Sequence, residues 1–397
     1  MRSTTRLLSS VTDQKIDLND FAGRTGYLFV RDGVGVAGQG VARRVARSEV
    51  ASALSSIIDE NVSGIASAGP IAIGCIPFDS SQPHEFIIPR VVIGKNADGS
   101  HWLTTIDDAQ PNFEVSQEAK PLAATFKVTQ GVSIDHYLEA VSATAKAVKD
   151  NKLKKAVIAR DIFVETDVSF DIRAVLHRLR SSFGSSYRYL IDNFLGASPE
   201  LLVAVNGDQV SSHPLAGTAP RTGDQATDKR NAEALIASAK NQEEHRIVID
   251  MVHDTLLPWC SFLDWQPEPS VVTVANVQHL GTEISGTLSD PRPSVLDLAY
   301  ALSPTPALGG APKKIALEQI AKVEGMNRGR YGGAVGYLNR HGDGIFAVAI
   351  RCAEIDQSGL IARLFAGGGI VADSEPASEL AETQAKFQAM LAALIRP

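Results

Sequence analysis

Acidic residues with helical spacing occur in two distant stretches of the chain, and their oxygens could bind a divalent metal ion. Glu379, Glu382 and Lys386 fall on one face of an expected C-terminal helix, while Asn241 and Glu244 fall within one turn of another. Each cluster alone is typical of a solvated helix face. If the helices face one another, Glu244 and Glu382 supply hard oxygen ligands, and Mg²⁺ prefers one or two carboxylates completed by water and substrate oxygens. The pattern therefore predicts an open magnesium site that suits a substrate carboxylate.

Two features just before the C-terminal helix could bind an anion. Residues 366–369 (AGGG) end an expected strand, and their backbone amides could approach an anion closely, although a turn would explain the glycines equally well. Arg351 lies in the apolar run FAVAIRC, which we interpret as one continuous strand. A guanidinium is costly there unless a carboxylate pairs with it, so a bound ligand and a structural ion pair are both consistent with Arg351.

An acid and a base are indicated by two polar residues at the starts of apolar strands. A lysine in a poorly solvated site beside other cations has a lowered pKa and can act as a general base, which is one interpretation of Lys155. Glu200 begins the apolar run ELLVAV, where a carboxyl group tends to keep its proton and can act as an acid. An exposed strand end is the alternative interpretation of Lys155.

The elements that must position these residues follow from hydrophobic periodicity. Strands are indicated over residues 155–165, over 201–215 as a hairpin turning at Asn206-Gly207, and over 345–369 as a further hairpin. Helices are predicted within residues 48–60 and over 137–152, 227–256 and 375–395, the last with Pro376 in its first turn. Antiparallel hairpins between long helices predict an α+β fold rather than a doubly wound sheet.

Composition and charge limit the class of protein. The chain has 397 residues, 44% of them hydrophobic and 21% charged, which excludes disorder and coiled coil. Polar turn-formers over residues 95–125 suggest a boundary, so we assign residues 1–130 to a scaffold and residues 131–397 to the catalytic region. A net charge of −7, three scattered cysteines and no long apolar run predict a cytoplasmic protein without nucleic-acid or membrane partners.

One motif points to a different class of function. Residues 33–38 match GxGxxG after a strand-like run, with Asp59 further on, as in a nucleotide-dependent oxidoreductase. The surrounding VRDGVGVAGQGVARRVA is more typical of a strand, a glycine turn and a second strand, and repeated βαβ units do not follow. We therefore discount dinucleotide binding.

Nine segments, in order along residues 131–395, resemble the motifs of the chorismate-utilising enzyme family, which includes isochorismate, salicylate and anthranilate synthases. They are KAVIAR, GASPELL, PLAGTAPR, KNQEEH, SPTPALGGAPK, GRYGGAVGYL, VAIRC, FAGGGIV and ELAETQAK. The resemblance implies the fold of anthranilate synthase component I, with a β-sandwich core flanked by helices, and chorismate as the substrate. Residues 1–130 show little of this signature.

The resemblance also implies a site. Glu244 and Glu382 look like Mg²⁺ ligands with Glu379 close by, while Asn241 stands where the family usually has a second acid, which changes the charge around the metal. The other implied residues are Tyr331 and Arg351, which resemble the clamp on the enolpyruvyl carboxylate, Gly367, Gly369 and Lys386 as further anion contacts, and Gly217, Thr218 and His279 as ring-side groups.

Three positions indicate which member of the family the chain resembles. Lys155 resembles the base of members that add water, whereas members that add ammonia lack this lysine and use a glutaminase subunit. Ala307 resembles the small residue of isochorismate synthases, where salicylate synthases tend to carry a hydroxyl, and Ser303 replaces a frequent histidine. We expect an Mg²⁺-dependent isochorismate synthase, an isomerase acting as a monomer without a glutaminase.

The expected product, isochorismate, would feed the biosynthesis of menaquinone, a siderophore or salicylate. Salicylate synthase, which goes on to eliminate pyruvate, is the alternative within the family. A catalytically silent binding subunit is disfavoured because Lys155, Glu200, Glu244 and Glu382 are all present.

Overall fold

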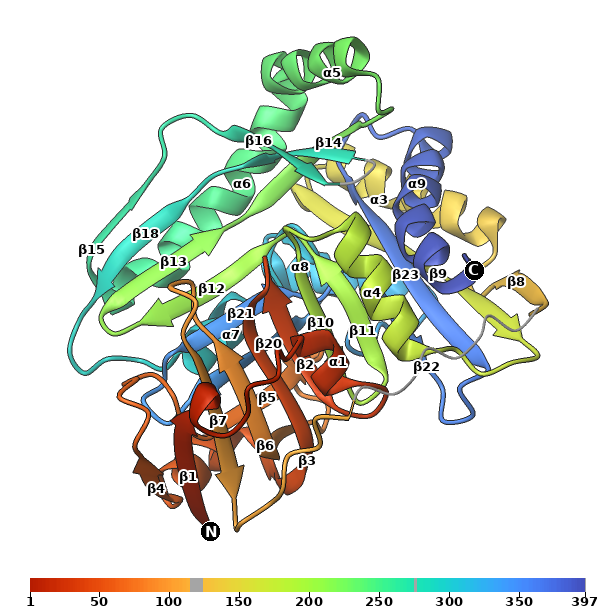
Figure 1. Ribbon diagram of the computed structural model, residues 1–397. Helices are drawn as coiled ribbons and strands as arrows, with labels where there is room; N and C mark the ends of the chain where they lie inside the picture. The colour runs from red at the N-terminus through yellow and green to blue at the C-terminus, as the bar shows by residue number, and fades with distance from the viewer. Residues whose placement is uncertain (115–123, 275–276, 397) are drawn as a thin grey trace.

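Strands from both halves of the sequence share one large, mostly antiparallel sheet in the computed structural model, which describes residues 1–114, 124–274 and 277–396 (Figure 1). Its strands are β1 (Arg2–Leu7), β2 (Tyr27–Arg31), β3 (Val34–Ala46), β4 (Ile58–Asn61), β5 (Ile71–Ile76), β6 (Glu85–Lys95), β7 (His101–Ile106), β8 (Phe126–Gln130), β9 (Lys155–Thr166), β10 (Tyr187–Ile191), β11 (Phe194–Ser198), β12 (Leu201–Asn206), β13 (Gln209–His213), β15 (Cys260–Trp265), β18 (Ile284–Leu288), β19 (Gly310–Ala311), β20 (Ala334–Asn339), β21 (Gly344–Val348), β22 (Cys352–Ile355) and β23 (Ile361–Ile370). A smaller sheet holds β14 (Leu215–Pro220), β16 (Ser270–Val274) and β17 (Val277–Gly281).

Helices pack on this sheet, which confirms the α+β class. They are α1 (Leu18–Ala22), α2 (Val50–Ser55), α3 (Ile134–Lys149), α4 (Ile172–Ser182), α5 (Gln225–Ala237), α6 (Ala239–Leu256), α7 (Val295–Leu302), α8 (Lys313–Val323) and α9 (Pro376–Ile395). Figure 1 shows the long strands β9 and β23 running beside α3 and α9. α3 contacts both strands, and α9 packs on β23 and accepts a hydrogen bond at Thr383 from Arg160 of β9. No helix among the described residues is long and apolar enough to cross a membrane.

The N-terminal and C-terminal strands are interleaved. β2 pairs with β10, and β5 pairs with β20, so residues before 115 add strands to the same sheet that carries the later motifs. Part of the polar stretch over residues 95–125 lies outside the described residues.

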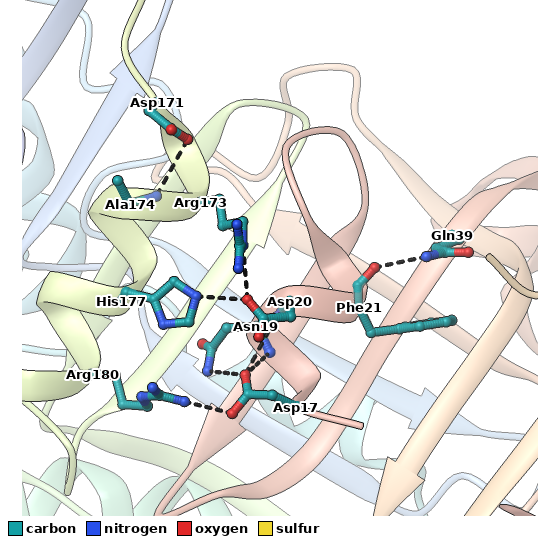
Figure 2. A network of polar contacts seen from close by, with 10 residues as sticks. All are labelled: Asp17, Asn19, Asp20, Phe21, Gln39, Asp171, Arg173, Ala174, His177 and Arg180. Carbon is teal, nitrogen blue, oxygen red and sulfur yellow. Dashed lines mark hydrogen bonds and ion pairs between the residues drawn. The ribbon is translucent and has the colours of Figure 1, made fainter. Parts of the chain in front are cut away.

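Charged side chains also tie the N-terminal helix α1 to α4 (Figure 2). Asp20 accepts hydrogen bonds from Arg173 Nε at 2.8 Å and from His177 Nε2 at 2.7 Å, and Asp17 pairs with Arg180. Asp17 also caps α1. Burial alone would raise the pKa of Asp17, but its hydrogen bonds and Arg180 outweigh burial and lower that pKa. The carboxylates of α1 thus anchor the N-terminal part of the sheet to α4.

Apolar side chains of the helices fill the space beside the sheet. In the largest cluster, Val248 of α6 and Leu298 of α7 pack with Phe86 and Phe346, all fully buried. A second cluster joins α4 and α9 to the sheet, and its members include Leu176, Leu190, Leu364 and Phe387. The helices that carry the acidic motifs, α6 and α9, are therefore fixed by core packing.

Two expected helices differ from the structure. The long helix predicted over residues 227–256 is wrong, because Ser238 leaves the helical conformation (ψ 109°) and separates α5 from α6. Its hydroxyl accepts a hydrogen bond from the Asn241 amide and so starts α6 as an N-cap. The helix expected within residues 48–60 is confined to α2, because the chain enters β4 at Ile58.

The interpretation of Arg351 as a mid-strand residue is also wrong. Arg351 adopts φ +52° between β21 and β22, so the apolar run forms two strands joined by a left-handed residue. Non-glycine residues seldom take this conformation, and such strain is common at functional sites. The expected hairpin over residues 345–369 is accordingly β22 and β23, with β21 pairing elsewhere, to β12 and β20.

The glycine-rich motif forms a hairpin. β2 and β3 pair antiparallel around Asp32 and Gly33, both with positive φ. The strand, turn and strand expected from the sequence are confirmed. β3 continues through Gly38 to Ala46, so no helix begins at the glycines as a dinucleotide motif requires.

Candidate active site

Lys155 is the first residue of β9 and contacts Glu244 of α6, and both line one cavity. Its side chain is 1% exposed, and Nζ donates a hydrogen bond to Glu244 Oε1 at 2.7 Å. A Cβ atom on Gly369 of β23 would lie 2.6 Å from Lys155 Cε and 2.8 Å from Glu244 Oε1. Only glycine leaves room here for the amine and the carboxylate to meet.

Glu200 lies in the same cavity as Lys155, immediately before β12. Burial raises its pKa to about 8, although Lys155 and Arg351 act in the opposite direction. The Leu215 amide donates to Oε1 at 3.4 Å. Glu200 therefore holds a proton at neutral pH, as the sequence predicts for a carboxyl group at the start of an apolar strand.

Arg351 is oriented into this cavity by His279 of β17. Its Nη2 lies 3.3 Å from His279 Nε2, while His279 Nδ1 lies 3.0 Å from the Gly217 carbonyl oxygen and 3.3 Å from Thr218 Oγ1. Burial, with Arg351 and Lys386, lowers the pKa of His279 to about 3, so the ring is neutral. A carbonyl only accepts, so Nδ1 carries the hydrogen and Nε2 accepts from Arg351.

Glu382 and Lys386 bring α9 to the same cavity. Lys386 Nζ donates to the Gly367 carbonyl oxygen at 2.7 Å and to Glu382 Oε1 at 2.5 Å. Burial alone would raise the pKa of Glu382, but Lys386 outweighs it and lowers that pKa, so Glu382 is ionised.

Ala307 and Tyr331 also line the cavity. The ring of Tyr331 stacks on Phe365 with centroids 5.2 Å apart, and its hydroxyl lies 3.0 Å from the position of a Cβ on Gly367. Burial raises the pKa of Tyr331, so its hydroxyl stays protonated and can donate a hydrogen bond.

Most residues selected from the sequence line this one cavity. Those that do are Lys155, Glu200, Gly217, Thr218, Glu244, His279, Ala307, Tyr331, Arg351, Gly367, Gly369, Glu382 and Lys386. Residues that the sequence reasoning did not select also line it, namely Val157, Pro199, Leu215, Ala216, Leu308 and Ile350. All six lie within the segments that carry the family resemblance, so their place in those motifs was the available signal.

Two proposed metal ligands do not line the cavity. A Cβ on Gly368 would lie 2.7 Å from Glu379 Oε2, and neighbouring residues of a strand point to opposite faces, so Glu379 and Glu244 approach β23 from opposite sides. Burial and the nearby Glu382 raise the pKa of Glu379. Asn241 packs against Gly217, where Oδ1 would lie 3.2 Å from a Cβ. Neither residue therefore belongs to the cavity lining.

The cavity can bind a dianion and exchange protons with it. Cationic Arg351 and Lys386 lie among its polar groups, with the ionised Glu382, the protonated Glu200 and the paired Lys155 and Glu244. Glu200 as a proton donor and the amine of Lys155 line one small cavity. This arrangement suits general acid and base catalysis on a single substrate.

Comparison with known proteins places the chain in a family. Residues 67–395 match the family model described as chorismate binding enzyme. The chain is 40% identical over 336 residues to the putative isochorismate synthase MenF of Mycobacterium tuberculosis, covering 82% of this chain and 86% of that protein. It is 34% identical to the isochorismate synthase DhbC of Bacillus subtilis, covering 82% and 81%.

A solved structure supports the same family assignment. The crystal structure of the putative 2,3-dihydroxybenzoate-specific isochorismate synthase DhbC from Bacillus anthracis superposes with a TM-score of 0.81 at 32% identity, covering 95% of this chain and 98% of that one. Anthranilate synthase component I from Streptococcus pneumoniae, at 21% identity and a TM-score of 0.70, shares the fold, as the sequence predicts. This chain belongs to the family of chorismate-binding enzymes.

Proposed function

We propose that the protein is an isochorismate synthase, which converts chorismate to isochorismate by adding water at C2 and removing the C4 hydroxyl. The observation that carries the proposal is that Lys155 and Glu200 line one cavity, with Glu200 protonated at neutral pH. The relatives named isochorismate synthase support the same reaction.

Cationic and hydroxyl groups would bind the substrate's enolpyruvyl carboxylate. Arg351 is held by His279 with its guanidinium in the cavity, and Tyr331 and Lys386 line the same space. A guanidinium can bind a carboxylate through two parallel hydrogen bonds. These groups provide a local positive site in a chain of net charge −7.

Lys155 and Glu200 would carry the proton transfers. The proposed mechanism requires Lys155 to react as the free amine. It would then keep donating one N–H to Glu244 while its lone pair takes a proton from water as that water bonds to C2. The ring double bonds shift, the bond between C4 and its oxygen breaks, and Glu200 protonates the departing hydroxyl, which leaves as water. Lys155 then holds the proton taken from the attacking water, while the proton of Glu200 has left with the departing hydroxyl. Lys155 must lose a proton and Glu200 must gain one before the next turnover.

The cavity also fits Mg²⁺. Glu244 and Glu382 both line it, and carboxylate oxygens are ligands that Mg²⁺ prefers. Among the described residues, no three His, Cys, Asp or Glu side chains are grouped to enclose a metal alone, so water and substrate oxygens must complete the shell. When bound, Mg²⁺ would orient and neutralise the ring carboxylate.

Glu244→Gln is expected to weaken Mg²⁺ binding by at least about tenfold, because one of the two carboxylate ligands is lost. The binding is measured by titration calorimetry of the folded protein with MgCl₂, without any activity assay. Glu243→Gln is the matched control, because Glu243 is the exposed neighbour. Equal Mg²⁺ affinity in Glu244→Gln and the wild type would contradict the assignment.

The nearest competing function is salicylate synthase, which would release pyruvate. Ala307 supports isochorismate as the final product, because no hydroxyl is present at this cavity position. The test is incubation with chorismate and Mg²⁺, followed by identification of the products and a pyruvate assay. We expect isochorismate without stoichiometric pyruvate, whereas salicylate with equal pyruvate would replace this proposal by its competitor.

A further inference from the structure

A buried ion pair lies next to the cavity without lining it. Glu324, which ends α8, and Arg328 are 2% and 3% exposed, and Arg328 Nε donates to Glu324 Oε1 at 2.7 Å. Arg328 also stacks over Phe78, with its guanidinium carbon 4.2 Å from the ring centroid. A buried ion pair is costly unless the remaining donors and acceptors are satisfied, so the other partners of this pair are informative.

Those partners are backbone groups of two cavity walls. Arg328 Nη2 donates to the Val157 carbonyl oxygen at 2.7 Å, and Nη1 donates to the Leu308 carbonyl oxygen at 2.7 Å. Glu324 Oε2 accepts from the Ala159 amide at 2.8 Å. Val157 and Leu308 both line the cavity, so one guanidinium joins the wall that begins with Lys155 to the wall that contains Ala307.

The ion pair fills a gap along one edge of β9. On that edge, β19 pairs with Lys155 and Ala156, and β8 pairs from Ile162 onward. Between them the Val157 amide reaches Gly309 of the loop before β19, and the ion pair satisfies the Val157 carbonyl and the Ala159 amide. The two side chains thus replace a missing stretch of strand at the point where β9 presents Lys155.

We propose that Glu324 and Arg328 are positioning residues, which set the distance between Lys155 and the Ala307 wall for the reaction proposed above. Neither side chain lines the cavity, so both act through the backbone of β9 and of Leu308. A misplacement of about 1 Å in a reacting group can cost about 100-fold in rate. An ion pair that fixes the position of Lys155, here called the brace, would therefore affect the rate strongly.

Glu324→Gln is expected to lower kcat at least about tenfold and to change KM less than about threefold. The amide nitrogen of glutamine cannot accept from Arg328 or from the Ala159 amide, so the brace loosens. Substrate affinity is retained because Arg351 and Lys386 are untouched. Arg328→Lys should likewise lower kcat more than it changes KM. A single ammonium cannot donate to the carbonyl oxygens of Val157 and Leu308 in the geometry of a guanidinium.

Asp161→Asn is the matched control. Asp161 is also a buried carboxylate of β9 paired with an arginine, Arg363, but it lies six residues from Lys155, about 20 Å along the strand. This variant should lose thermal stability without losing kcat at temperatures where it is folded.

The outcomes are distinguishable from failure of the proposed function. If the wild type makes isochorismate and Glu324→Gln keeps wild-type kcat, or if Asp161→Asn loses kcat to the same extent, the positioning role is overturned. It is also overturned if neither Glu324→Gln nor Arg328→Lys folds, because the pair is then a folding element. Absence of isochorismate from the wild type would instead reject the proposed function.

Discussion

Lys155→Ala is expected to lower kcat for isochorismate formation by about 100-fold or more, the usual scale for loss of a general base. The variant removes the only amine that faces both Glu244 and the cavity within the described residues. The fold should persist, because the lost side chain borders a cavity rather than the apolar core. Steady-state rates and the thermal unfolding midpoint are the two measurements.

Lys154→Ala is the control for this variant. Lys154 is the exposed neighbour of Lys155, and its backbone amide, which donates to the Ala311 carbonyl, is kept in the alanine variant. We expect wild-type kcat. Near-normal turnover in purified, folded Lys155→Ala would remove the base from the mechanism.

Glu200→Gln is expected to reduce kcat by about 100-fold or more, because glutamine has nearly the shape of the acid but cannot deliver the proton. The amide oxygen can still accept from the Leu215 amide, so the fold is expected to persist. Since the active form of Glu200 is protonated and its pKa is raised to about 8, wild-type kcat/KM, which reports groups of the free enzyme, should fall as the pH rises through about 8.

The pH profile distinguishes Glu200 from other groups. In Glu200→Gln the residual activity should lack the decline near pH 8, because the group responsible is absent. Glu283→Gln, at an exposed position, should keep the wild-type profile. A decline that persists unchanged in Glu200→Gln would show that another group is the acid.

Local patterns predicted the elements and most of the cavity. Lys155 could be assigned to the start of a strand because a mostly apolar run of 12 residues forms β9 from that position. Glu382 could be assigned to one face of a helix because helical spacing follows Pro376. The Asn206-Gly207 hairpin and the glycine-rich hairpin at Gly33 follow from turn chemistry. These features depend on residues close in sequence, so the sequence alone carries them.

Features that depend on distant contacts were missed. The positive φ of Arg351 contradicts simple periodicity. The break at Ser238 follows from N-capping, a local signal that hydrophobic periodicity does not register. The face of β23 that Glu379 approaches depends on the path between β23 and α9. Glu324 and Arg328 look like an ordinary helical pair until the strand edge that they complete is known.

The most direct test of the central claim is a single turnover experiment in H₂¹⁸O with chorismate and Mg²⁺, with the product analysed by mass spectrometry. If Lys155 activates water while Glu200 releases the C4 hydroxyl, the isochorismate formed carries one ¹⁸O at C2. Isochorismate without the label would contradict the account, because its oxygen would then have migrated within the substrate rather than come from water.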